Sequence, residues 1–438
     1  MNMKVSPPAI LALTAACALS PAHAAEAAAP DMAANGFVIF STTLVLLMSV
    51  PAIGLFYGGL TRAKNIMSVL QQCLAVFCMA LVLWYVVGYS LAFAESDTAA
   101  GQFFGSWDKF ALLGVNAESL SGELWEFIFI SFQGAFCAIS ACLIVGATVE
   151  RIRFSALLVA VAIWIVLSYA PLAHMVWGGG FIDAQFSPYD FAGGVVVHIN
   201  AAVAGLVGAM MLGPRHDLGR VSMAPHNLPL TFIGAGLLWI GWCGFNAGSA
   251  LTPDGTAALS LFNTLLAPAA AALAWMCTEW LICGKPSGLG TASGVIGGLV
   301  AITPACAFVS PAGALVIGLV SGVLCLWGVR GFKRLIRVDD SLDVFGIHGI
   351  AGIAGALLTG VFCAPGLGGA GYNGEWTSVA GQLYAQLLSV VIGAGWSAVV
   401  AYGAFKVAGL LTGGLRVDAE EETEGLDLAA HGERGYNL

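Results

Sequence analysis

Two apolar segments of the chain are similar in sequence: V-H-I-N-A-A-V-A-G-L (197–206) and I-H-G-I-A-G-I-A-G-A (347–356). Aligning His198 with His348 matches small and branched residues over the following turns, as far as Gly205 and Gly355. A histidine inside an apolar helix is costly in a bilayer, and such residues usually face a bundle interior or a pathway. Two of them at matching places predict a route through a membrane. The alternative is a pair of hydrogen-bonded core histidines.

Composition places the chain among membrane proteins. Of its 438 residues 59% are hydrophobic and only 9% are charged, and the mean hydropathy is +0.88. Soluble domains carry about 25% charged residues, so we expect a polytopic, all-α membrane protein. The net charge of −9 comes mainly from loops and the C-terminal end, and in the absence of a basic patch we expect no nucleic-acid partner. The eleven cysteines lie mostly in apolar stretches, which favours small buried hydrophobes over disulfides or metal ligands.

The order of segments predicts three regions. Residues 1–24 have the features of a secretory signal peptide, with Lys4, a short apolar core and the cleavage site Ala22-His23-Ala24. A membrane domain is expected over residues 25–412 and a cytoplasmic regulatory tail over residues 413–438. Eleven apolar segments are long enough to cross about 30 Å of hydrocarbon. They cover about residues 36–57, 65–93, 123–148, 154–172, 193–212, 228–249, 258–282, 289–307, 312–332, 343–362 and 379–412.

The basic residues predict the orientation, because cytoplasmic loops accumulate lysine and arginine. With the mature N-terminus in the periplasm, fourteen of the fifteen basic residues after the signal peptide fall inside, and only Lys109 falls outside. We therefore expect a cytoplasmic C-terminus and a location in the bacterial cytoplasmic (inner) membrane. The two histidine segments are the fifth and tenth spans and run in opposite directions, which predicts a five-plus-five inverted repeat followed by one long final helix. Asp190 and Asp343 precede the two histidines and would be counterparts.

Aromatic residues gather at the expected periplasmic ends of three spans. Phe132 and Phe136 are one helical turn apart, Trp177 follows the fourth span, and Phe245 with Ser249 ends the sixth. Aromatic faces and one hydroxyl can recruit a small cation by cation–π contact and hydrogen bonding. An aromatic belt at the membrane interface is the alternative.

The spans themselves contain almost no acidic residue, and no stretch resembles a carbonyl filter. A bare monovalent cation would therefore find no substitute for its hydration shell. Two imidazoles in an apolar lining suit a molecule that hydrogen-bonds weakly and can exchange a proton. A histidine-bound metal would need carboxylates or further histidines nearby, so we expect no enzyme, no metal and no cofactor. A sensor would need a separate partner, because only about 25 residues follow the last span.

Several motifs resemble those of the ammonium transporter (Amt) family, in its bacterial branch, from about residue 35 to the C-terminal end. They are G-L-F-Y-G-G-L (54–60), V-E-R-I-R-F-S-A (149–156), S-Y-A-P-L-A-H-M-V-W-G-G-G (168–180), D-F-A-G-G-V-V-V-H-I-N-A (190–201), P-H-N-L-P (225–229), G-F-N-A-G-S (244–249), T-P-A-C (303–306) and D-D-S-L-D-V-F-G-I-H-G (339–349). The resemblance implies a homotrimer in the lipid bilayer with one pore per subunit. It also implies ammonium or ammonia as the substrate, with methylammonium as an analogue.

The resemblance also implies roles for single residues. The external ammonium site would consist of Phe132, Trp177 and Ser249, the rings that close the pore entrance would be Phe136 and Phe245, and the twin histidines would be His198 and His348. Asp190 resembles an aspartate near the outer site, with either a structural role or a role in deprotonation. The tail resembles a segment that permits regulation by PII-type nitrogen regulatory proteins. Ammonium would lose its proton, and ammonia would cross the pore while the proton travels separately. A neutral gas channel and an ammonium sensor remain as alternatives.

Overall fold

The computed structural model describes residues 29–436, so the predicted signal peptide lies outside the described residues. Within them, ten helices are long and apolar enough to cross a membrane, and Gly288–Ile302 is a shorter apolar helix at the place of the eighth expected span. The ten are Met32–Leu60, Ala63–Phe93, Glu126–Thr148, Phe154–Phe186, Gly194–Leu212, Leu228–Gly248, Gly255–Cys283, Pro311–Ile336, Phe345–Phe362 and Val379–Leu411. The prediction of an all-α polytopic membrane protein is confirmed, and the helices agree with the eleven expected spans.

Several spans consist of α-helices joined through π-helical turns. The membrane elements are α2 (Met32–Leu47), α3 (Ile53–Leu60), α4 (Ile66–Leu83), α5 (Tyr89–Phe93), α6 (Glu126–Thr148), α7 (Phe154–Trp164), α8 (Ala170–Trp177), α10 (Asn200–Leu212), α11 (Leu228–Gly248), α12 (Gly255–Cys283), α13 (Gly288–Ile302), α14 (Pro311–Trp327), α15 (Lys333–Ile336), α16 (Ile350–Phe362) and α17 (Val379–Leu411). The connecting and tail elements are the antiparallel strands β1 (Leu120–Ser121) and β2 (Leu124–Trp125), and the helices α9 (Phe181–Phe186), α18 (Ala419–Glu424) and α19 (Leu426–His431).

Polar side chains mark where many of the helices begin. The first turn of a helix has backbone N–H groups without helical partners, and a preceding aspartate, asparagine or serine accepts their hydrogen bonds. The side chains that accept such a bond are those of Asp31, Asn227, Asp254, Ser287, Ser310 and Ser378. These caps set the helix ends locally, while the apolar composition of each segment sets its burial in the bilayer.

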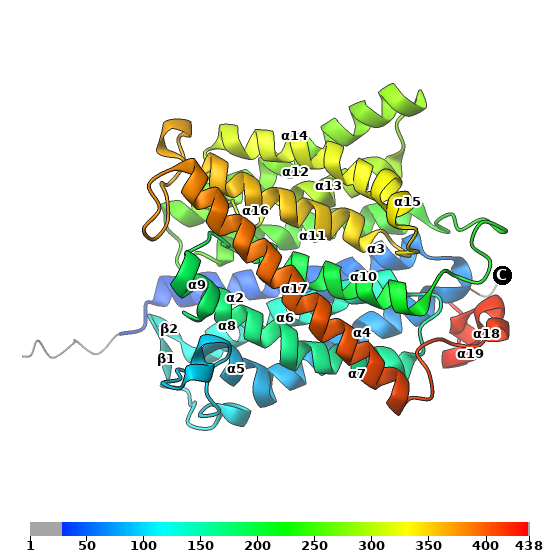
Figure 1. The fold of residues 1–438 in the computed structure, drawn as a ribbon, viewed down its shortest axis with the longest axis horizontal. Helices are drawn as coiled ribbons and strands as arrows, with labels where there is room; N and C mark the ends of the chain where they lie inside the picture. The colour runs from blue at the N-terminus through cyan, green and yellow to red at the C-terminus, as the bar shows by residue number, and fades with distance from the viewer. Residues whose placement is uncertain (1–28, 437–438) are drawn as a thin grey trace, which may run out of the picture.

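The helices pack side by side with nearly common axes, and the tail helices α18 and α19 lie at the end opposite β1 and β2 (Figure 1). The final long helix, α17, crosses the bundle obliquely and contacts α7, α10 and α16. It therefore ties together elements from both halves of the chain. This is the arrangement expected of an inverted repeat followed by one added helix.

The inverted repeat can be followed residue by residue. His198 lies in the π-helical turn Gly194–Ile199 and His348 in the π-helical turn Phe345–Gly349. The residue five before each histidine has a left-handed backbone, with a φ of 107° at Gly193 and 59° at Asp343. The two halves of the chain thus start the histidine helices in the same way.

The expectation that Asp343 is the counterpart of Asp190 is wrong, and Asp340 takes that place. The Asp190 carboxylate accepts hydrogen bonds from the backbone N–H groups of Gly194 (2.5 Å), Val195 (2.9 Å) and Val196 (3.2 Å). In the other half, Asp340 accepts from the N–H of Phe345 at 2.7 Å. Both acids stand eight residues before their histidine, whereas the Asp343 carboxylate pairs with the Lys333 ammonium at 2.7 Å.

Matching glycines hold the two histidine helices against the third and eighth spans. A Cβ added at Gly355 would lie 2.1 Å from the Ala301 carbonyl oxygen of α13. A Cβ added at Gly205 would lie 2.9 Å from the Ala147 Cβ of α6. Small residues let helix backbones approach closely within a bilayer. These glycines therefore fix the depth at which each histidine enters the bundle.

Candidate functional site

A cavity with an aromatic wall opens at the end of the bundle remote from the tail. The space open to the centre of a water-sized molecule is about 210 Å³, and none of the lining side chains is charged. They are those of Phe93, Phe129, Gln133, Phe136, Trp177, Phe191, Ser249 and Leu251. We call this space the aromatic cavity.

Two of the three residues predicted to bind ammonium line this cavity, and the third lies behind its wall. The Trp177 Nε1–H donates to the Asp190 carbonyl oxygen at 2.8 Å, which fixes the indole. The Ser249 hydroxyl donates to the Phe245 carbonyl oxygen at 2.9 Å, so its oxygen lone pairs remain able to accept. Phe132 is only 1% exposed and packs against Phe136 with ring centroids 4.8 Å apart.

Phe136 and Phe245 close the floor of the aromatic cavity. Their rings are stacked at a centroid distance of 4.0 Å and an interplanar angle of 9°. Both side chains are almost completely buried, with exposed fractions of 1% and 0%. The stack separates the aromatic cavity from a narrow lumen on its other side.

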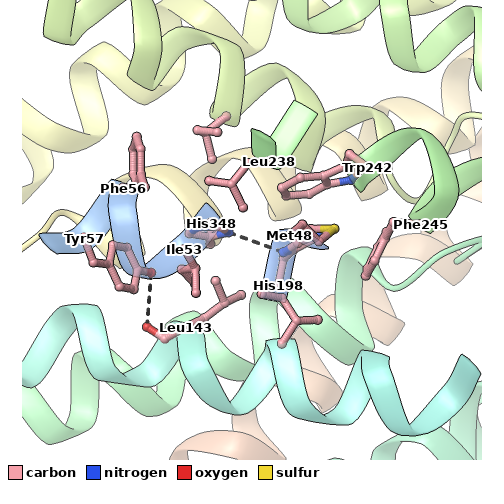
Figure 2. A pocket seen from close by; sticks show the side chains of 12 residues that line it. Met48, Ile53, Phe56, Tyr57, Leu143, His198, Leu238, Trp242, Phe245 and His348 are labelled. Carbon is pink, nitrogen blue, oxygen red and sulfur yellow. Dashed lines mark hydrogen bonds between the residues drawn. The ribbon is translucent and has the colours of Figure 1, made fainter. Parts of the chain in front are cut away.

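The two histidines meet inside that lumen, as predicted from the paired segments. Their Nδ1 atoms are 3.3 Å apart, and their rings lie 5.3 Å apart at 27° (Figure 2). Two nitrogen atoms at this distance share one proton, so one imidazole donates through Nδ1 and the other accepts. The first then has a bare Nε2 and the second an Nε2–H. The neutral pair therefore carries both an acceptor and a donor.

The rest of the lumen is apolar and very narrow. The space open to the centre of a water-sized molecule is about 10 Å³, close to the minimum of roughly 10–15 Å³ that one water needs. The lining side chains are those of Met48, Ile53, Phe56, Tyr57, Ile139, Leu143, His198, Leu238, Trp242, Phe245, Ile296 and His348. None of these lining residues carries a carboxylate that could replace part of the hydration shell of a cation.

Asp190 lies beside the aromatic cavity but does not line it. Burial raises the pKa of its carboxyl to about 6, while the backbone N–H groups at the start of the histidine helix act in the opposite direction. Both carboxylate oxygens accept hydrogen bonds from that helix start, and its carbonyl oxygen holds Trp177. Its contacts are those of a residue that orders both the tryptophan and the histidine helix.

The structure adds two residues that the sequence had not singled out. Trp242 stacks on His198, with ring centroids 5.2 Å apart and an interplanar angle of 20°. The sequence could have identified Trp242, because it stands three residues before Phe245 and therefore lies on the same helix face. Gln133 lines the aromatic cavity, and its Oε1 is buried without a hydrogen-bond partner among the described residues. In the sequence it lies between Phe132 and Phe136 and is the one amide side chain of that stretch.

A second, larger cavity opens at the tail end of the bundle and is rich in charge. The space open to the centre of a water-sized molecule is about 360 Å³. Its charged lining side chains are those of Arg215, Glu279, Arg330, Lys333 and Asp343. We call it the charged cavity. It adjoins the lumen, since Ile347 lines the charged cavity and the neighbouring His348 lines the lumen.

A buried ion cluster surrounds Arg215, one of the residues that line the charged cavity. Arg215 donates from Nε and Nη2 to the two oxygens of Asp339, both at 2.9 Å, and from Nη1 to Glu150 at 3.0 Å. The side chains of Arg215, Asp339 and Glu150 are 5%, 1% and 0% exposed. Burial alone would raise the pKa of Asp339, but the Arg215 guanidinium holds it at about 2. The cluster joins three loops that are far apart in the sequence.

The tail packs on the same end of the bundle mainly through hydrogen bonds. The Asp427 carboxylate accepts from the N–H of Ser68 at the start of α4 at 2.8 Å, and Glu422 accepts from the N–H of His216 at 2.6 Å. Between a basic loop residue and a tail acid, the described ion pair is Arg153 to Asp418 at 3.5 Å. The tail therefore contacts loops from the first half of the chain.

Comparison with known proteins agrees with this geometry. The model of the Ammonium Transporter Family matches residues 36–436. The chain is 41% identical over 400 residues to an ammonium transporter of Bacillus subtilis (strain 168), which covers 91% of this chain and 97% of that protein. It is 43% identical over 427 residues to an ammonium transporter of Aquifex aeolicus (strain VF5), with 95% and 96% covered.

Solved structures give the same result. A protein named "Sensor Amt Protein" superposes with a TM-score of 0.84 at 27% identity, covering 91% of this chain and 98% of that one. Saccharomyces cerevisiae Mep2 superposes with a TM-score of 0.79 at 32% identity, covering 89% and 91%. The chain therefore belongs to the ammonium transporter family and is a multi-pass membrane transporter of ammonium, not an enzyme.

Proposed function

We propose that ammonium binds in the aromatic cavity, loses a proton there, and crosses the lumen as ammonia past His198 and His348, while the proton crosses separately and makes transport electrogenic. Trp177 and Phe136 would hold the cation by their ring faces and Ser249 by its hydroxyl oxygen, with Phe132 supporting Phe136 from behind. The observation that carries this proposal is the neutral, hydrogen-bonded histidine pair inside a lumen that is otherwise apolar. Neutral ammonia needs far less desolvation than the ion, so it fits such a lumen and the ion does not.

The same argument explains how potassium would be excluded. Potassium has no proton to release, so it would have to cross the lumen bare and without oxygen ligands. Current evoked by ammonium in reconstituted proteoliposomes tests the proposal. We expect a current with ammonium and none with potassium. Electroneutral ammonium flux would instead favour the neutral gas channel, and equal currents with both ions would contradict the mechanism.

Removing the Trp177 ring should weaken ammonium binding in the aromatic cavity without blocking the pore. We expect Trp177→Leu to raise the half-saturating ammonium concentration roughly 5- to 30-fold, because one good ring contact contributes about 1–2 kcal/mol. Transport at saturating ammonium should survive. The measurement is the concentration dependence of methylammonium uptake. Trp107→Leu is the matched control, since Trp107 is 58% exposed and does not line the cavity. Loss of transport at every concentration would instead make Trp177 structural.

We also propose an orientation of the protein in the membrane. The aromatic cavity would face the periplasm, and the charged cavity and tail the cytoplasm of a bacterium, in the inner membrane. Fourteen of the fifteen basic residues that follow residue 24 support this orientation. The functional unit would be a homotrimer with one pore in each subunit.

The tail is proposed to make transport responsive to a PII-type nitrogen regulatory protein. Its contacts with the start of α4 and with the loop at His216 give such a partner a defined surface at the tail end. Deleting the residues after Arg416 should leave a folded trimer whose transport is reduced or no longer inhibited by that partner. Uptake in the presence of the purified partner measures this. A deletion after Gly432, which keeps α18 and α19, is the control. If the partner fully inhibited the protein truncated after Arg416, the tail would have no role in this regulation.

One solved relative is named as a sensor, so a sensing role is the second candidate. The relatives with the higher identities of 41% and 43% are both named as transporters. Ammonium flux through the purified protein separates the two roles, because a sensor without transport gives none.

A further inference from the structure

The two mouths of the pore differ in charge although the fold is an inverted repeat. The aromatic cavity has no charged lining residue, whereas the charged cavity has three cations and two carboxylates. The charged cavity continues from the lumen, because Ile347 lines it directly beside His348 and Leu60 lines it one turn beyond Phe56. Whatever leaves the lumen past His348 enters this cavity.

Each carboxylate in the charged cavity is already neutralised. Glu279 accepts from the Arg330 guanidinium at 3.0 Å and from the N–H and hydroxyl of Ser287, both at 2.9 Å. Asp343 accepts from the Lys333 ammonium at 2.7 Å. An ammonium ion in this cavity would have to displace a tethered cation before it gained a carboxylate.

The wall of the charged cavity also contains a hydrogen-bond donor, the Trp275 indole N–H, which cannot accept a hydrogen bond from ammonium. Trp275 is 3% exposed, and its Nε1–H has no partner among residues 29–436. It points over Gly290, where an added Cβ would lie 2.5 Å from that nitrogen and 2.4 Å from Glu279 Oε2. An indole N–H donates and cannot accept, so it cannot bind an ammonium N–H.

We propose that Arg330 and Lys333 make the pore asymmetric by excluding ammonium ion from the charged cavity. Ammonium would then bind productively from the aromatic end, and ammonia would leave at the charged end and take up a proton from water there. This inference rests on the proposed ammonium site in the aromatic cavity. The asymmetry concerns rates and half-saturating concentrations, and net flux still vanishes when both sides are at equilibrium.

The test compares the two ends of the full-length protein. Uptake of methylammonium is measured as a function of concentration in right-side-out and inside-out membrane vesicles, and protease access to the tail assigns the exposed end. We expect the half-saturating concentration to be about tenfold or more higher at the charged end. Lys333→Gln, which frees Asp343, and Arg330→Gln, which frees Glu279, should each lower that value about 3- to 10-fold and leave the aromatic end unchanged.

Two further variants separate the cavity charges from general effects. Arg334→Gln removes an exposed cation one residue from Lys333 that does not line the cavity, so it should change neither end. Lys333→Arg keeps the charge and should keep the asymmetry. Equal half-saturation at both ends of the intact protein would overturn the proposal. So would equal shifts at both ends in Lys333→Gln and Arg330→Gln.

Failure of the proposed function gives a different result. No uptake from either end would reject methylammonium transport itself, whereas uptake with equal half-saturation rejects only the asymmetry. If neither glutamine variant assembled, the comparison of the two ends of the intact protein would decide alone.

Discussion

Replacing His198 by glutamate is expected to open the pore to potassium. In the proposed mechanism, the lumen excludes a bare cation because its lining is apolar and because the neutral histidine pair carries no net charge. A carboxylate at this depth supplies a negative charge and two oxygens, which replace part of the lost hydration shell. We expect potassium leak in proteoliposomes to rise at least tenfold above that of the intact protein, since about 1.4 kcal/mol of cation stabilisation suffices for that factor.

Two further variants test whether the potassium leak depends on the introduced charge. His198→Gln keeps a polar side chain of similar size without the charge, so its leak should stay near background. His348→Glu places the carboxylate on the other member of the pair and should leak as His198→Glu does. The leak should increase with pH as the new carboxyl loses its proton. Background leak in both glutamate variants at alkaline pH, with folded protein, would show that exclusion does not depend on the neutrality of the histidine pair.

The sequence predicted the histidine pair because two independent signals agreed. An ionisable residue is rare in an apolar run, and the segments around His198 and His348 repeat each other. The odd spacing of the two spans then required opposite directions, which brings the two histidines together at mid-depth. The 3.3 Å contact follows from that symmetry.

The counterpart of Asp190 was mistaken because two acids stand close together before His348. Asp340 and Asp343 are both suitable helix caps by residue type, but only Asp340 has the eight-residue spacing to its histidine that Asp190 has. Asp343 adopts a left-handed backbone at the position where the first repeat has Gly193. Its carboxylate is thereby free for Lys333, and only the three-dimensional contact reveals this.

The charged cavity could not be predicted from the sequence in any detail. Its five charged residues come from three separate parts of the chain. Counting the basic residues of each loop predicts the orientation in the membrane but not which residues contact one another. Which carboxylate neutralises which cation depends on packing between α12, the π-helical turn Gly328–Phe332 that leads into α15, and the loop that contains Asp343. The same holds for the tail, because nothing in the sequence pairs the Asp427 carboxylate with the N–H of Ser68 at the start of α4.

The buried ion cluster at the tail end should be the most sensitive point for stability. Arg215→Met leaves the Asp339 and Glu150 carboxylates in place, both almost unexposed, and removes the guanidinium that bonds to both. Glu150 keeps its ion pair with Arg62 at 2.9 Å, but Asp339 loses its paired guanidinium, and breaking a buried ion pair from one side costs about 3–5 kcal/mol. We expect a loss of this size, measured by thermal unfolding in detergent. The matched control is Arg334→Met at an exposed position of the same end, with an expected change below about 0.5 kcal/mol.

The dependence on pH distinguishes this cause from lost packing. In the intact protein the pKa of Asp339 is about 2, below its ordinary value of 3.8, so its contribution is present above pH 4 and disappears as the pH falls towards 2. Without Arg215, we expect the pKa of this carboxyl to rise above its unfolded value, because burial raises it and Arg151 is the remaining cation that lowers it. Protonation then favours the folded variant, so its deficit against the intact protein should shrink between pH 7 and pH 4. A deficit that stayed constant over this range would mean that Arg215 contributes by its shape and not by its charge.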